Sequence, residues 1–109
     1  MTTFKKKYKT EGEFQQDLKK RLRETYPIKA GGVVLKNDPN DIQGIADLGI
    51  GYKGTCAYLE AKKDKGASHR PNQDWYVNQI NSTGGFARFI YPENAEEVLK
   101  EMEEYFNGV

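Results

Sequence analysis

The chain lacks several features that mark secreted and membrane proteins. It has a single cysteine, Cys56, so no disulfide can form within the chain, which fits a reducing compartment. It has no apolar run near the ~20 residues that a membrane-spanning helix needs. The lysines near the N-terminus are followed by no apolar stretch, so we expect no secretory signal and a cytoplasmic location. The simplest interpretation of Cys56 is then a small buried hydrophobic residue.

Net charge is also small, but its distribution is uneven. The chain of 109 residues has a net charge of +1, yet residues 1–36 hold ten Lys or Arg against four Asp or Glu. Residues 92–109 hold one Lys against six Glu. This division fits a polyanion on one face, although charge blocks of this kind are more often plain solvated surface. We find no repeat or linker, and predict a basic N-terminal arm (1–9) followed by one domain (10–109).

Three amphipathic segments predict helices. The first begins at Thr10, which has capping-box spacing with Glu13, and ends at Tyr26-Pro27. The second begins with Pro71 at its first position and stops at Gly84-Gly85. Their inward faces are expected to be Phe14, Leu18 and Leu22; Tyr76, Val77 and Ile80; and, in the last helix, Ala95, Val98, Leu99, Met102 and Phe106.

Four shorter segments predict strands. Val33–Leu35 is expected to be a short buried strand, and Phe86–Tyr91 is another. Ile45–Gly51 and Thr55–Lys62 predict a hairpin with a tight turn at Lys53-Gly54. Residues 37–41 form a dense turn cluster, in which Asp38 and Asp41 are turn residues. The predicted order α-β-β-β-α-β-α indicates an α/β fold with a mixed four-stranded sheet flanked by helices.

The second hairpin strand carries the candidate catalytic residues. Side chains alternate along a strand, so Ala57, Leu59 and Ala61 should face the core, and Tyr58, Glu60 and Lys62 the other side. Asp47 lies in the preceding strand, where its carboxylate can meet that of Glu60. Two close carboxylates repel each other, and a divalent cation such as Mg²⁺ would offset this repulsion. With Lys62 holding the attacking water and the scissile phosphate, the group fits metal-assisted phosphodiester hydrolysis.

The spacing of these residues resembles a known signature. Asp47, twelve intervening residues and Glu60-Ala61-Lys62 resemble the PD-(D/E)XK nuclease motif, and the wider pattern is similar to stand-alone, virus-type VRR-Nuc nucleases. Ala46 stands where that family usually has proline, and the Val-Arg-Arg tripeptide that names it is absent. The supporting segments, in family order, are Glu11-Gly12-Glu13-Phe14-Gln15, Gln43-Gly44-Ile45-Ala46-Asp47-Leu48, Glu60-Ala61-Lys62 and Pro71-Asn72-Gln73.

The resemblance implies a restriction-endonuclease-like core and a role for each motif residue. Asp47, Glu60 and the carbonyl of Ala61 would bind Mg²⁺, for which Mn²⁺ can substitute. Lys62 would assist the water, and Gln73 would support the site from the second helix. The implied substrate is DNA, with Holliday junctions, flaps or other branched forms favoured, and the implied assembly is a homodimer. Whether one or two metal ions bind stays open.

Several residues admit competing interpretations. Glu11 and Glu13 compete for the acidic role in the first helix, and we favour Glu11, because Glu13 can complete the capping box. A buried Gln73 could simply satisfy core hydrogen bonds, and His69 is expected in an exposed loop, contacting phosphate or nothing. The predicted phosphate-binding residues are Lys5, Lys6, Lys7, Lys36, Lys63, Lys65 and Arg70.

Three classes of function therefore compete. The first is a metal-dependent endonuclease. The second is a catalytically silent nucleic-acid-binding or inhibitor module on the same scaffold, which would have no need of clustered carboxylates beside DNA. The third is an interaction domain that docks through its acidic last helix. Cleavage of branched DNA in the presence of magnesium separates the first from the other two.

Overall fold

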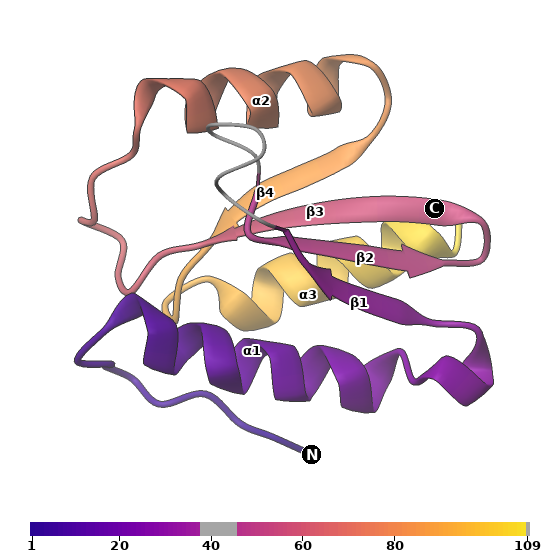
Figure 1. Cartoon of the computed structure of the whole chain (residues 1–109), viewed down its shortest axis with the longest axis horizontal. Coiled ribbons are helices and arrows are strands. Elements are labelled where there is room, and N and C mark those ends of the chain that lie inside the picture. The colour runs from indigo at the N-terminus through magenta and orange to yellow at the C-terminus, as the bar shows by residue number, and fades with distance from the viewer. Residues whose placement is uncertain (38–45, 109) are drawn as a thin grey trace.

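A four-stranded sheet separates two layers of helices in the computed structural model, which describes residues 1–37 and 46–108 (Figure 1). Helices α1 and α3 lie on one face of the sheet, and α2 lies on the other. The predicted element order and fold class are confirmed, with a short 3-10 turn added after α1. The elements are α1 (Glu11–Thr25), the 3-10 turn (Ile28–Ala30), β1 (Val33–Lys36), β2 (Leu48–Tyr52), β3 (Thr55–Ala61), α2 (Pro71–Ser82), β4 (Phe86–Ile90) and α3 (Ala95–Phe106).

The sheet is mixed, in the order β1-β2-β3-β4. The first three strands are antiparallel, and β4 runs parallel to β3, to which it is connected through α2. The β2–β3 turn is tight, because Lys53 and Gly54 both adopt positive φ (53° and 75°). This agrees with the turn expected at these two residues. No helix formed by the described part of the chain is long and apolar enough to cross a membrane.

The core lies between the sheet and the α1/α3 layer. The predicted alternation along β3 is confirmed, because Ala57, Leu59 and Ala61 are fully buried on this face. The predicted inward residues of α1 are buried as well, and only Leu99 of the predicted α3 face stays partly exposed. The buried helical residues opposite the strands are Phe14, Leu18, Leu22, Ala95, Val98, Met102 and Phe106.

Two predictions of burial are wrong. Val33 and Leu35 are 46% and 58% exposed, because β1 is an edge strand and only Val34 points toward α1. Cys56 is also exposed. It shares a face of β3 with Glu60, but it lies at the opposite end of the strand, whereas α2 packs mainly against β4.

The predicted strand limits need smaller corrections. The strand predicted at Ile45–Gly51 is β2, which begins at Leu48, so Asp47 lies one residue before it. Lys62 lies one residue beyond β3, although its N–H still donates to the carbonyl of Ile90 at 2.8 Å. The predicted turn residues Asp38 and Asp41 and the motif segment Gln43-Gly44-Ile45 lie outside the described residues.

The N-terminal segment packs along α1. Thr2 donates its N–H to Glu24 Oε1 at 2.7 Å, and Phe4 packs on Phe14 with ring centroids 5.7 Å apart. Tyr8 is buried in the core and donates its hydroxyl to Asp17 Oδ2 at 2.7 Å. The apolar and aromatic residues therefore fix this segment, while the three lysines of residues 5–7 project into solvent.

Gly32 is required where the chain turns from α1 into the sheet. A Cβ atom on this residue would lie 2.2 Å from the carbonyl oxygen of Tyr26, which is closer than any side chain can approach. Only glycine allows this backbone crossing. The crossing places β1 directly above the end of α1, and from there the chain continues to Asp47.

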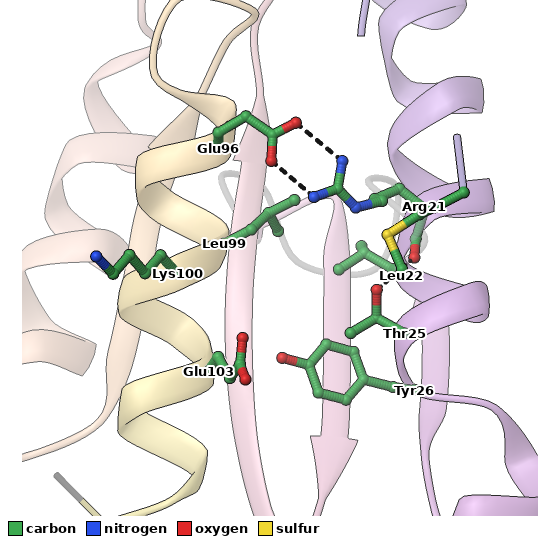
Figure 2. Close-up of a pocket in the computed structure, with 9 residues that line it drawn as sticks. Arg21, Leu22, Thr25, Tyr26, Glu96, Leu99, Lys100 and Glu103 are labelled. Carbon is green, nitrogen blue, oxygen red and sulfur yellow. Dashed lines mark hydrogen bonds and ion pairs between the residues drawn. The ribbon is translucent and has the colours of Figure 1, made fainter. Parts of the chain in front are cut away.

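A groove of about 400 Å³ runs between α1 and α3 (Figure 2). At one end Arg21 pairs with both carboxylate oxygens of Glu96, at 2.9 and 2.6 Å. The buried ring of Tyr26 points across the groove toward Glu103, and burial followed by the charge of Glu103 raises the pKa of Tyr26 to about 12. The Arg21–Glu96 pair therefore links the two helices beneath the sheet, on the face opposite α2.

Candidate active site

Asp47 and Glu60 are held together at the start of the β2–β3 hairpin. Leu48 pairs with Leu59 in the antiparallel register, which places Asp47 next to Glu60. The N–H of Asp47 donates to Glu60 Oε2 at 2.9 Å, and the N–H of Ala61 donates to Asp47 Oδ2 at 2.9 Å. The Glu60 carboxylate therefore accepts from the backbone of Asp47, and the Asp47 carboxylate accepts from the backbone of Ala61, the residue after Glu60. This crossed arrangement fixes the two side chains as one unit.

Asn37 supports the unit from the end of β1. Its N–H donates to the carbonyl of Asp47 at 2.8 Å, and its side-chain amide donates to the carbonyl of Ala46 at 2.8 Å. These two bonds extend the β1–β2 pairing by one residue, so Asp47 stays aligned with the sheet although it precedes β2. Asn37 was predicted only as a turn residue, and its side-chain role depends on contacts that the sequence pattern does not reveal.

Burial raises the pKa of both carboxyl groups in this pair. Glu60 is only 2% exposed, and burial, followed by the charge of Asp47, raises the pKa of Glu60 to about 8. Burial raises the pKa of Asp47 as well, but hydrogen bonds from the Ala61 amide and the Glu60 carboxyl lower it. Near neutral pH the pair therefore holds a proton that an exposed pair of carboxylates would have lost. A divalent cation could take the place of that proton.

Lys62 and Gln73 complete the buried polar cluster. Lys62 is 6% exposed and donates from Nζ to Gln73 Oε1 at 2.9 Å, while its distance to Glu60 Oε1 is 4.0 Å. Gln73 is 8% exposed, and its side-chain nitrogen donates to Glu60 Oε1. The amide of Gln73 thus bridges the carboxylate and the ammonium. All four predicted residues, Asp47, Glu60, Lys62 and Gln73, meet in one cluster.

Gln73 has a second role in starting α2. Its Oε1 also accepts the N–H of Arg70, the residue that precedes the helix, at 3.0 Å, and its own N–H donates to the carbonyl of Arg70 at 3.0 Å. This satisfies two backbone groups that a helix start otherwise leaves without partners. The sequence signal for this role is present, because Pro71 marks the first helical position and Gln73 the third.

Glu11 lies in the first turn of α1 and is exposed. Thr10 caps this helix by accepting the N–H of Glu13 at 3.1 Å, as predicted. Partial burial raises the pKa of Glu11, and the charges of Lys62, Asp47 and Arg70 also act on it. Glu11 therefore lies within electrostatic range of the cluster, and its catalytic role stays a prediction.

The predicted phosphate-binding residues lie on several elements around the cluster, and all are exposed. Lys36 ends β1, and its positive charge lowers the pKa of Asp47. Arg70 precedes α2 and interacts electrostatically with Glu11. Lys6, Lys7 and Lys63 line a common groove of about 360 Å³, so two lysines of the N-terminal segment lie beside the loop after β3; Lys5 and Lys65 lie next to this group in sequence.

The cluster by itself supplies only some of the ligands that a magnesium ion needs. Within residues 1–37 and 46–108, no three His, Cys, Asp or Glu side chains gather closely enough to enclose a metal ion. Two hard carboxylates are nevertheless the set with which proteins hold Mg²⁺ when water and a substrate phosphate supply the other ligands. The Asp47 carboxylate accepts hydrogen bonds from the Ala61 N–H and the Glu60 carboxyl, which leaves lone pairs for a further ligand.

One residue near the cluster is more ordered than the sequence suggested. His69 lies in an exposed loop, as predicted, and in addition its ring stacks on Phe89 with centroids 3.9 Å apart and its Nδ1 lies 3.1 Å from Asp74 Oδ1. The only sequence signal for this arrangement is the position of His69, two residues before the helix-starting Pro71.

Comparison with known proteins identifies the fold. No family model matches the chain, and no curated protein matches it. A solved structure described as a VRR_NUC domain is similar over 83% of this chain and 95% of its own length, with a TM-score of 0.60 and 24% sequence identity. At this identity the likeness establishes the fold, and the resemblance noted in the sequence is confirmed at that level.

Proposed function

We propose that this chain, which has the fold of a VRR_NUC domain, is a metal-dependent endonuclease that hydrolyses phosphodiester bonds in DNA. The observation that carries the proposal is the crossed pair of the half-buried Asp47 and the buried Glu60, beside the buried Lys62. A protein that only needs stability gains little from a buried carboxyl group beside a half-buried one, since burial and the charge of Asp47 raise the pKa of Glu60 to about 8. Perturbed carboxylates of this kind concentrate at functional sites.

The residues that would hold the metal are Asp47, Glu60 and the carbonyl of Ala61. Mg²⁺ is the expected ion, and Mn²⁺ is expected to substitute. When bound, the ion would neutralise the two carboxylates, activate a water molecule and stabilise charge on the scissile phosphate. Asp47 would supply one ligand oxygen, and Glu60 would supply the second after losing its proton.

Lys62 and Gln73 would organise the reacting groups. The ammonium of Lys62 is fixed by the Gln73 carbonyl oxygen, so it can donate to a water molecule or a phosphate oxygen without reorienting. Gln73 in turn orients Glu60 through its amide nitrogen. Glu11 would add a carboxylate from α1, on the far side of the substrate phosphate. Fixed donors and acceptors of this kind stabilise the transition state more than mobile ones do, because they need not reorganise during the reaction.

The substrate follows from the charges around the cluster. Lys36 and Arg70 are exposed, as are Lys6, Lys7 and Lys63, which line a groove together with Asp64 and Glu93, and these cations would contact phosphates. Phosphate contacts position DNA without reading its sequence, so we propose selection by DNA structure, with Holliday junctions, flaps or other branched forms as substrates. Symmetric cutting of two strands requires two sites, so we propose a homodimer as the active form.

The test is single-turnover cleavage of linear, flap and four-way junction DNA in Mg²⁺, Mn²⁺, Ca²⁺ and EDTA. Wild type should cleave with Mg²⁺ or Mn²⁺ alone. Asp47→Asn is the sharpest variant, because asparagine keeps an oxygen for the Ala61 amide and removes the charge. It should abolish cleavage and leave the melting temperature unchanged or higher. Cleavage by Asp47→Asn at the wild-type rate refutes the site, whereas tight DNA binding without cleavage by wild type supports a catalytically silent binding module.

A further inference from the structure

His69 is held in place on two sides although it lies in a loop. Its ring is nearly parallel to that of Phe89, with an interplanar angle of 16° and centroids 3.9 Å apart. On its edge, Nδ1 lies 3.1 Å from Asp74 Oδ1. The side chain is still 30% exposed. Fixing a partly exposed side chain costs conformational entropy, so an arrangement with two partners calls for an explanation.

The position of His69 relates it to the candidate active site. Phe89 is the register partner of Glu60 in the parallel β3–β4 pair, and paired residues of neighbouring strands project from the same face of a sheet. The imidazole therefore lies over the strand next to Glu60, on the face that α2 covers. The following residue, Arg70, is bonded through its N–H to the same Gln73 oxygen that holds Lys62.

The chemistry of the ring leaves one nitrogen available. When both ring nitrogens carry hydrogen, Nδ1–H donates to Asp74 and Nε2–H is left as a donor with a positive charge. Nε2 has no hydrogen-bond partner in the described part of the chain. Building on the proposed nuclease function, we infer that His69 is a phosphate-positioning residue, whose Nε2 donates to a DNA phosphate beside the one that is cleaved.

A structural role predicts something different. His69 and Asp74 occupy the positions before and within α2 at which side chains often pack to fix the start of a helix. That role requires the contacts with Phe89 and Asp74, but it does not require Nε2. His69→Phe separates the two roles, because phenylalanine keeps an aromatic ring to stack on Phe89 and has no nitrogen. Lys100→Met is the matched control, since it removes one exposed positive charge from α3, on the other side of the sheet.

The experiment measures binding of an uncleaved four-way junction in Ca²⁺ across a salt series at about pH 6, at a temperature well below melting, with single-turnover cleavage in Mg²⁺ alongside. For His69→Phe, we expect affinity to fall about tenfold, as for loss of a charged hydrogen bond. The slope of log K against log salt should become shallower by about 0.9, the value for one phosphate contact. Cleavage should fall at least as much as binding. Lys100→Met should change none of these values.

The outcomes separate this inference from the proposed function. If wild type binds and cleaves DNA while His69→Phe keeps its salt slope and its cleavage rate, His69 is only a helix-start residue and the inference is overturned. If His69→Phe melts earlier but keeps the wild-type salt slope, the same conclusion holds, because the slope counts ionic contacts of the folded protein. If wild type neither binds nor cleaves DNA, both the proposed function and this inference are wrong.

Discussion

The ammonium of Lys62 donates to the side-chain oxygen of Gln73 at 2.9 Å, so this buried cation is held by a neutral amide. The nearest carboxylate oxygen in an ion pair with it, Glu60 Oε1, lies at 4.0 Å. An amide positions the charge without neutralising it. The charge of Lys62 therefore remains able to attract a phosphate or a water molecule. A close salt bridge would weaken that attraction.

Lys62→Met should affect the reaction far more than the fold. Methionine keeps the apolar stem and removes a buried charge that is held by a neutral amide and not by a close ion pair, so the melting temperature should change little. Turnover should fall ~10²-fold or more, as for loss of a positioned catalytic group. Lys62→Arg should also fail, since a planar guanidinium cannot fill the same compact place. Single-turnover cleavage and thermal melting of the three proteins give the comparison, and an unfolded Lys62→Met variant would assign Lys62 a structural role.

The stability of the metal-free protein should decrease as pH rises from about 5 to about 8. The pKa of Glu60 is about 8 in the folded state against an ordinary 4.5, so between these values the folded protein binds a proton that the unfolded chain has lost. Folding is then favoured at low pH, and this contribution is lost as pH rises toward 8. The slope from one group is at most ~1.4 kcal/mol per pH unit.

Denaturant unfolding in EDTA at several pH values measures this effect, with Glu60→Gln as the test variant. The glutamine should flatten the pH dependence, whatever its effect on overall stability. Glu104→Gln, which changes an exposed carboxylate of α3, is the control and should leave the dependence unchanged. A wild type and a Glu60→Gln variant with equal slopes would show that Glu60 ionises normally.

Neutralising Lys5, Lys6 and Lys7 together should weaken binding of all DNA alike. Each lost phosphate contact makes the slope of log K against log salt shallower by about 0.9 for duplex DNA. The slope of the triple Lys→Gln variant should therefore change by up to roughly three times that amount. The fold should persist, because Phe4 and Tyr8 anchor this segment through their own packing. A loss confined to one DNA sequence or one DNA structure would show that these lysines recognise more than phosphate.

Leu35→Lys should disrupt the proposed homodimer. The edge strand β1 leaves Val33 and Leu35 exposed, and no other strand of the described residues pairs with its outer edge, a surface that a second copy could cover. Sedimentation of wild type and variant across a concentration series measures the effect, with Trp75→Lys, at another exposed apolar residue, as the control. A wild-type dimer that is unchanged by Leu35→Lys places the interface elsewhere, and a wild-type monomer refutes the dimer.

The sequence predicted best where a pattern is local. The α3 face repeats over three turns, and the hairpin turn at Lys53-Gly54 fixes the register that brings Asp47 beside Glu60. Exposure was harder to predict, because it depends on which helix covers which part of the sheet. Val33 and Leu35 were therefore expected inside and lie outside. The ring of His69 was missed for a similar reason, since its partner Phe89 comes from a strand formed twenty residues later.

The double use of Gln73 ties the site to the first turn of α2. The oxygen that accepts Lys62 also accepts the backbone N–H of Arg70, so unwinding that single turn would release the ammonium and the Glu60 carboxylate at once. The strands could stay paired while these site contacts are lost, because α2 covers the sheet mainly at one strand, β4. Amide hydrogen exchange at this helix start therefore reports directly on the population of molecules with an assembled site, and a ligand that requires the assembled form must slow that exchange.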